Sequence, residues 1–171
     1  GPFTDVKELK ADIKREITAQ KEREAKEKLK DELVAELADS SKVALPELLI
    51  DDQLRSIEQD LMQNLSYRGL TMDSYLKTQG FKDKADWQKK EARPAAEKRV
   101  KAGLVLAELS KELGVEVGRE ELDRQISTFK QQYGKDVKLA ARFDDLNVHR
   151  DIANRMITDK TIDKLVELNS K

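Results

Sequence analysis

The chain has 171 residues, of which 39% are charged and 5% are aromatic, and it contains no cysteine. Because 33 Lys and Arg residues oppose 34 Asp and Glu residues, the composition argues against a nucleic-acid partner, which requires clustered excess cations. The absence of cysteine excludes disulfides and thiolate chemistry. No apolar run approaches the roughly 20 residues that span a bilayer, and no signal peptide is visible, so we expect a cytoplasmic protein with no membrane partner.

Residues 3–40 are predicted to form one long, charged helix. Apolar residues recur three and four positions apart near both ends of this segment, whereas the middle, QKEREAKEK, is strongly helix-forming and almost wholly polar. We expect such a helix to bury both of its ends and to bridge two parts of the molecule. The preceding residues 1–2, Gly-Pro, resemble a protease-cleavage scar and are set apart from the domain. The recurring apolar positions are Val6, Leu9, Ile13, Ile17, Leu29, Leu33 and Leu37.

The stretch VALPELLID, residues 43–51, interrupts this helical pattern. Pro46 disfavours a helical conformation at Leu45 but suits the first turn of a new helix. We therefore expect an extended corner in which Val43 and Leu45 turn inward, and a first hairpin or arm that occupies residues 43–83. The helix after the corner carries its apolar face at Ile50, Leu54, Ile57, Leu61 and Leu65.

A second segment, VEVGREELD at residues 115–123, has the same layout. The sequences before the two corners also match, LVAEL at 33–37 with VLAEL at 105–109, and the apolar positions after them fall in register. Similarity at a fixed offset suggests two copies of one supersecondary unit, although common helical spacing can produce the same matches by chance. We predict two helical hairpins. Residues 84–134 are expected to form a long helix and the second hairpin, or arm.

The other helix boundaries are predicted from capping residues. Thr71 and Asp83 have side chains suited to an N-cap, and the segment TMDSYLKTQ between two glycines is predicted to be a short helix. Glycine adopts the left-handed cap conformation without a Cβ penalty. Helices are therefore expected to end at Gly69, Gly80, Gly114 and Gly134.

A long helix is predicted from about Lys84 to Leu113, and Pro94 should kink or split it. Its segment Val100–Leu109 is apolar nearly all round, so it is predicted to be the most buried part of the chain. Residues 135–171 are predicted to form C-terminal helices, a short one around Leu139 and Phe143 and a last one from Ile152 through Val166. The predicted fold class is all-α, an elongated helical domain with a body of long helices and two protruding hairpin arms, over residues 3–171.

No pattern of catalytic or metal-binding residues is found. The single histidine, His149, is more typical of a surface or capping residue than of a base, and nothing positions a nucleophile beside it. The pairs Asp51-Asp52 and Asp144-Asp145 are explained by the preference for carboxylates at helix starts. Phosphate-binding glycine loops and zinc motifs do not occur. We predict no enzyme activity, no cofactor and no metal.

Large apolar side chains in short helices, or near helix ends, are the candidate binding residues. One interpretation is that they fill small satellite cores. The other is that some stay exposed, because an extended helical chain has little interior in which to hide them, and exposed apolar patches mark partner binding. The candidates are Met62, Leu65, Tyr67, Leu70, Met72, Tyr75, Phe81, Trp87, Phe129 and Tyr133.

Several segments together resemble the C-terminal domain of bacterial trigger factor, the ribosome-associated chaperone family. They are VALPELLID, RGLTMDSYLKTQG, ARPAAEKRVKAGLVLAELSKELGVEVGREELDRQI and IANRMITDKTIDKLVEL, and the resemblance covers about residues 3–168. One departure is Gly118, where the family more often has a hydroxyl N-cap, which should weaken that cap slightly.

The resemblance implies a helical body with two arms that form a cradle for unfolded or nascent polypeptides, without ATP. It also implies that ribosome docking and prolyl isomerase activity belong to domains that this sequence lacks. The alternative is a structural helical module that homodimerises through the same apolar faces, and weak self-association is left open. A third hypothesis, an enzyme built on surface carboxylates, would require turnover that is lost on His149→Ala.

Overall fold

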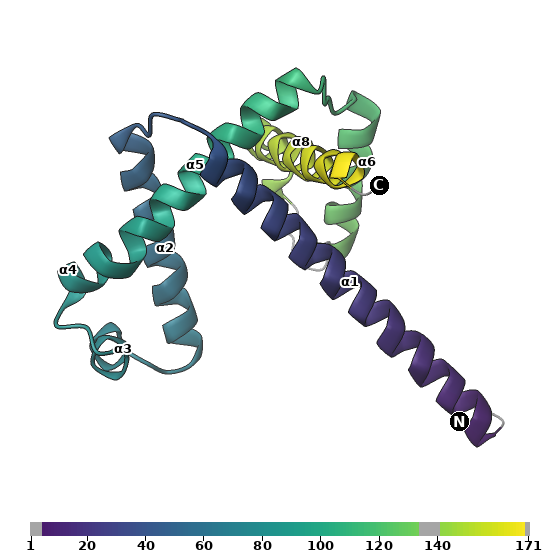
Figure 1. The fold of residues 1–171 in the computed structure, drawn as a ribbon, viewed down its shortest axis with the longest axis horizontal. Coiled ribbons are helices and arrows are strands. Elements are labelled where there is room, and N and C mark those ends of the chain that lie inside the picture. The colour runs from purple at the N-terminus through teal and green to yellow at the C-terminus, as the bar shows by residue number, and fades with distance from the viewer. Residues whose placement is uncertain (1–4, 134–140, 170–171) are drawn as a thin grey trace. The chain divides into compact units, whose positions relative to one another are not determined.

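A computed structural model describes residues 5–133 and 141–169, and helices account for most of them (Figure 1). The helices are α1 (Val6–Ser40), α2 (Glu47–Tyr67), α3 (Met72–Gln79), α4 (Lys84–Trp87), the π-helical turn η1 (Gln88–Ala92), α5 (Arg93–Glu112), α6 (Arg119–Tyr133) and α8 (Leu146–Asn169). No strand occurs within 5–133 or 141–169, so the all-α fold class is confirmed.

The single domain expected over 3–171 divides into two compact units. The continuous unit is Leu37–Glu112, and the split unit combines Gly1–Glu36 with Leu113–Lys171. The segment 43–83, expected to form an arm of its own, belongs to one unit with α5, because the apolar face of α2 packs against that helix.

The corner before α2 is non-helical over residues 41–46, as predicted, but Pro46 precedes the first turn of the helix instead of lying in it. Pro46 is the N-cap residue, with φ −65° and ψ 128°, and the carbonyl of Pro46 accepts from the N–H groups of Leu49 and Ile50. Val43 and Leu45 are half-buried, and Leu45 packs against the cluster formed by Ile50, Ala96 and Val100. Local backbone chemistry at a proline therefore starts the helix that carries one side of this core.

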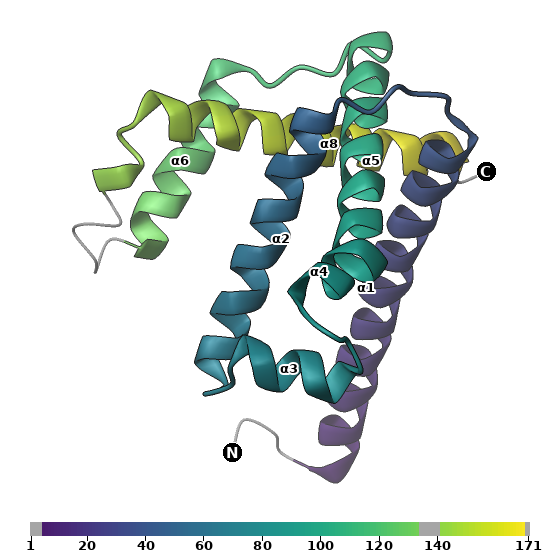
Figure 2. The same ribbon diagram turned by 90° about the vertical axis from the view of Figure 1, so that its left-hand side faces the viewer.

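Helices α2 and α5 lie side by side and run antiparallel, with α3 across their end (Figure 2). Ile50 near the start of α2 contacts Ala96 and Val100, whereas Glu58 further along α2 pairs with Lys84 and accepts from Gln88. A second cluster of Leu76, Trp87 and Ala92 closes the unit where α3 meets η1. The pairing buries the apolar faces that the helical spacing predicted.

Pro94 neither ends the helix nor leaves it regular. The residues before it form the π-helical turn η1, in which the N–H of Arg93 donates to the carbonyl of Gln88, five residues back. Proline has no N–H to donate and its ring crowds the preceding turn, so a wider turn there relieves both defects. Instead of the predicted kink or split, the helix stays continuous and contains a π turn just before Pro94.

The most buried side chains lie nearer the start of this run than we expected. Trp87, Ala92 and Ala96 are almost completely enclosed because α2 and α3 cover this part. Within Val100–Leu109, by contrast, Ala107 is exposed and Leu104 is only half-buried. Apolar residues all round a helix do not by themselves produce the deepest burial.

The predicted helix caps are confirmed where the structure describes them. Thr71 forms a capping box with Ser74, and Asp83 accepts from the N–H of Asp86 at 2.8 Å. Gly69, Gly80 and Gly114 have positive φ, as left-handed caps require. Gly134 and the expected helix around Leu139 fall wholly or partly outside the described residues.

In the split unit, α6 packs against α8, and α8 also holds the second corner. The Lys160 ammonium donates to the carbonyl of Glu116 at 3.0 Å, and that of Lys164 donates to the carbonyl of Leu113 at 2.9 Å. Val115 and Val117 are half-buried and non-helical, like Val43 and Leu45 in the first corner. The two corners therefore share their layout but are fixed differently, one by a proline and the other by lysines.

The first helix does not bury both ends as predicted. Near its C-terminal end Ala38 is buried, and Lys30 lies 3.0 Å from the Asp163 carboxylate of α8. The N-terminal stripe is exposed because none of the described residues covers it. Its members are Val6, Leu9, Ile13 and Ile17. None of the helices in the described part of the chain has both the length and the apolar character of a membrane span.

Candidate functional site

The ten candidate binding residues differ widely in exposure. Leu65 and Trp87 are core residues, with exposed fractions of 5% and 1%, so neither side chain is available to a partner at the surface. Leu65 also anchors the end of α2, where its carbonyl accepts from the N–H of Leu70 at 2.9 Å. Leu65 lies on α2 and Trp87 on α4, and both fit the satellite-core interpretation because they are buried and Trp87 packs with Leu76 of α3 and Ala92 of η1.

Three further candidates, Met72, Tyr75 and Phe81, are half-buried and pack against the cluster around Trp87. The Tyr75 hydroxyl and the Trp87 indole N–H both lie 3.4 Å from Oε1 of Glu91. Burial raises the pKa of the Tyr75 phenol, and the negative charge of Glu91 adds to the shift. These three side chains therefore pack partly into the core of the continuous unit and expose only part of their surface to solvent.

Met62, Tyr67 and Leu70 are exposed, at 53%, 82% and 47%. All three lie at the C-terminal end of α2 or in the turn to α3, where Gly69 takes φ +66° and reverses the chain. A turn of this kind leaves the last side chains of a helix without a neighbouring helix to cover them. Their side chains are therefore accessible to a partner.

The last two candidates, Phe129 and Tyr133, line a groove between α6 and α8. Phe143 joins them, with its ring centroid 5.7 Å from that of Phe129 and 6.1 Å from that of Tyr133, both stacked. Tyr133 is 42% exposed and the other two rings are half-buried. The rings thus form an aromatic wall that is open to solvent on one side.

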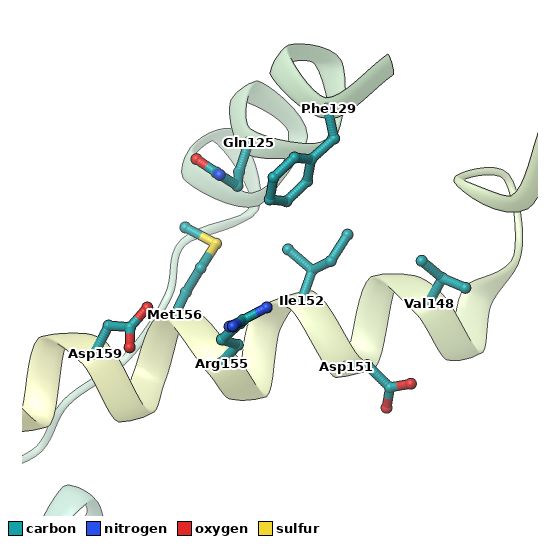
Figure 3. A pocket seen from close by; sticks show the side chains of 8 residues that line it. All are labelled: Gln125, Phe129, Val148, Asp151, Ile152, Arg155, Met156 and Asp159. Atoms are coloured by element: carbon teal, nitrogen blue, oxygen red, sulfur yellow. The ribbon is translucent and has the colours of Figure 1, made fainter. Parts of the chain in front are cut away.

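The opposite wall of the groove is the apolar face of α8 (Figure 3). Val148, Ile152 and Met156 follow one another at intervals of four residues, and the side chains of Ile152 and Met156 point toward Phe129 and Gln125 of α6. Two overlapping hollows, of about 540 and 390 Å³, make up the groove. We call this surface the α6–α8 groove. Its lining residues are Gln125, Phe129, Tyr133, Arg142, Phe143, Val148, Asp151, Ile152, Arg155, Met156 and Asp159.

Sequence reasoning missed Phe143, Val148, Ile152 and Met156 as binding residues. The four-residue spacing on α8 was a usable signal, but Ile152 was named only as a position of the last helix, which was predicted to run through Val166. That helix has apolar residues on more than one face, and only its packing on α6 decides which face lines a groove.

Ion pairs hold the groove walls in place. Lys160 of α8 contacts Glu121 of α6 at 2.8 Å, and Lys130 of α6 contacts Asp144 at 2.5 Å. These hydrogen bonds lower the pKa of both carboxyls. His149 also supports the wall, since its Nε2 lies 2.7 Å from the carbonyl of Phe143. That contact fits the structural role expected for His149.

The lining of the groove is suited to binding an apolar ligand. Its lining consists of apolar and aromatic side chains with a few charged groups near the rim, the composition of a site that captures apolar ligands. Among the described residues, no cluster of His, Asp and Glu could hold a metal ion.

A further hollow, of about 650 Å³, lies in the continuous unit beside the first corner. Val43, Pro46, Leu104 and Leu109 supply its apolar surface, and Glu108 and Glu112 give it an acidic side. Its lining contains no aromatic residue and so lacks the aromatic wall of the α6–α8 groove, and we regard it as the lesser candidate.

Comparison with known proteins relates the whole chain to one family. The family model of the bacterial trigger factor protein C-terminus matches residues 5–167. The chain is 36% identical over 168 residues to a trigger factor of Halothermothrix orenii. The aligned region covers 98% of this chain and 39% of that protein. It is 34% identical over 170 residues to a trigger factor of Carboxydothermus hydrogenoformans, with 96% and 38% covered. No solved structure matches.

The chain thus spans less than half the length of these curated relatives. The family match, in contrast, runs through both compact units and includes both corners, α6 and nearly all of α8. The chain belongs to the bacterial trigger factor C-terminus family.

Proposed function

We propose that this chain is an ATP-independent chaperone domain that binds unfolded or nascent polypeptides through exposed apolar surface and prevents their aggregation. The observation that carries the proposal is the open, aromatic-walled α6–α8 groove in a chain that is 39% charged. Apolar hollows with a few polar groups are typical binding sites, and membership of the trigger factor family supports the same function.

Two separate surfaces are proposed for clients, the α6–α8 groove in the split unit and the exposed end of α2 in the continuous unit. Phe129 and Tyr133 contribute from the groove, and Met62, Tyr67 and Leu70 contribute from α2 and the following turn. Methionine is flexible and polarizable, so it can adapt to clients of different shape. Leu65 and Trp87 are left out because they are buried.

Binding by such a surface is expected to be weak and reversible. Each client Leu or Phe that becomes buried contributes roughly 1.5–3 kcal/mol. About five such contacts give on the order of 10 kcal/mol, and association and ordering cost about 4–15 kcal/mol. A near balance of these terms lets clients leave and fold. The many charged side chains elsewhere keep the protein soluble while apolar groups stay exposed.

Aggregation of a denatured test protein tests the proposal. Light scattering should fall when the chain is added at equal molar ratio without nucleotide, and Phe129→Ser should lose much of this effect because it removes one ring of the aromatic wall. Leu168→Ala is the matched control, since Leu168 is a large exposed residue of α8 outside the groove. Equal scattering with and without the wild-type chain would refute the proposal.

One observation favours the alternative, a module that homodimerises. On α1, at about 100° per residue, the exposed stripe Val6, Leu9, Ile13 and Ile17 has lysines on one side and acidic residues on the other. In a parallel pair of such helices, opposite flanks face each other, so unlike charges would meet. The flanking residues are Lys7, Lys10 and Lys14 on one side and Asp5, Asp12 and Glu16 on the other.

Sedimentation velocity separates the two functions. A dimer that dissociates on Leu9→Ser, combined with no suppression of aggregation, would favour the structural module. A monomer that suppresses aggregation favours the chaperone. We further propose a cytoplasmic location, and we assign any ribosome contact to other parts of the longer family members.

A further inference from the structure

The charged side chains at the α6–α8 groove are not evenly distributed. Arg142 lies with Tyr133 and Phe143 at the end near Val148, and Arg155 lines both overlapping hollows. Asp159 lies at the opposite end, beside Met156 (Figure 3). Asp151 also lines the rim, but its side chain points away from α6. Arg142 therefore places a cation at the end with the aromatic wall, Arg155 lies where the two hollows overlap, and Asp159 places an anion at the other end.

Among the described residues, the two arginines and Asp159 have no charged partner. Within residues 5–133 and 141–169, no ion pair involves Arg142, Arg155 or Asp159. The nearby Asp144 is already bound to Lys130, and Asp145 accepts from the backbone N–H of Asn147 at 2.8 Å. Guanidinium groups that border an apolar surface without a partner can pair with a carboxylate on a ligand.

From this distribution we propose that the α6–α8 groove binds apolar segments that carry an acidic residue at one end, seated with that acid toward Arg142 and Arg155. The apolar part contacts Phe129, Phe143 and Ile152, and Asp159 repels a segment that enters with the acid at the other end. This inference rests on the proposed function and narrows it, since charge now selects among clients of equal apolar content and fixes their direction.

Three labelled peptides with blocked termini test the charge preference. They share a core of Leu and Phe and differ at one end, which carries aspartates, asparagines or lysines. Fluorescence anisotropy should rank the acidic peptide about two- to fivefold tighter than the neutral one, as expected for partly exposed ion pairs, and the basic peptide weakest. The ranking should disappear at about 1 M salt, where the Debye length is about 3 Å.

Variants assign the preference to these two side chains. In R142E/R155E the ranking should reverse, and in Arg155→Gln the advantage of the acidic peptide should shrink. Arg150→Glu is the matched control, because Arg150 is an exposed arginine of α8 that does not line the groove. A ranking that persists in R142E/R155E, with the fold verified by circular dichroism, would overturn the inference.

Direction is tested with a nitroxide label beside the aspartates of the acidic peptide. It should broaden the amide NMR signals of Phe143 and Val148 more than those of Gln125 and Met156, and the reverse pattern would overturn the proposed seating. If all three peptides bind equally, the charge inference fails and apolar capture stands. If none of them binds, the proposed function fails as well.

Discussion

The two compact units differ in how far they enclose their apolar side chains. In the continuous unit, α2, α3 and α5 cover two clusters, and Trp87 and Ala96 are almost inaccessible. In the split unit, Ile126, Thr161 and Val166 are buried, while the rings of Phe129, Tyr133 and Phe143 lie beside an open groove. The same chain thus builds one closed core and one open surface.

The number of helices at each cluster explains the difference. Around Trp87, residues of α2, α3 and the run from α4 to α5 meet from several directions, and a short helix capped at both ends closes the gap. At the groove, the described lining comes from two helices, α6 and α8, and from Arg142 and Phe143 in the segment before α8. Two helices in contact bury only the stripe between them, so residues beside that stripe stay accessible to a partner.

The largest effect is expected from opening the closed core. Leu76→Ala should lower the unfolding free energy of the continuous unit by about 2–5 kcal/mol, because it leaves a cavity beside Trp87 and Ala92. The chain has one tryptophan, so the fluorescence of Trp87 in a urea titration reports on this unit directly. Met62→Ala, at an exposed position of α2, is the control and should change stability by less than about 0.5 kcal/mol. Equal effects of the two substitutions would contradict a closed core.

A groove substitution should cost far less. Ile152→Ala is expected to change the unfolding free energy of the split unit by about 1 kcal/mol or less, because the side chain is only half-buried and alanine favours helix. Client binding should weaken in the same variant, since Ile152 lines both hollows of the groove. Thermal unfolding followed by circular dichroism gives the stability. A loss as large as that of Leu76→Ala would mean that Ile152 is a core residue.

The smallest expected effect is electrostatic. The hydrogen bond from Lys160 lowers the pKa of Glu121 in the folded protein. The ionised carboxylate therefore stabilises the split unit at pH values above the pKa of Glu121 in the unfolded chain, about 4. This stabilisation is lost as the pH falls through the lower pKa of the folded state. Lys160→Met should return the pKa of Glu121 toward its ordinary value in an NMR titration. Asp86 of the continuous unit, whose pKa is lowered by Lys90, is the internal control and should not move. An unchanged Glu121 in Lys160→Met would exclude this ion pair as the cause.

Much of the helical framework was predictable because its determinants are local. Pro46 required an extended residue before it, Thr71 and Asp83 could satisfy free N–H groups, and Gly69 and Gly80 could take positive φ. Each of these features depends on a few neighbouring residues in the sequence. The sequence also indicated that Pro94 disturbs its helix, but it did not indicate that a π turn before the proline accommodates the disturbance.

The sequence by itself determined where the helices and the two corners lie and that large apolar side chains outnumber the places to bury them. Only the tertiary structure decided which of them are covered: Leu65 and Trp87 became core, while the stripe from Val6 to Ile17 and the groove beside Phe129 stayed open. The physical reason is that helix formation depends on neighbours along the chain, whereas burial depends on which distant helix packs against a given face.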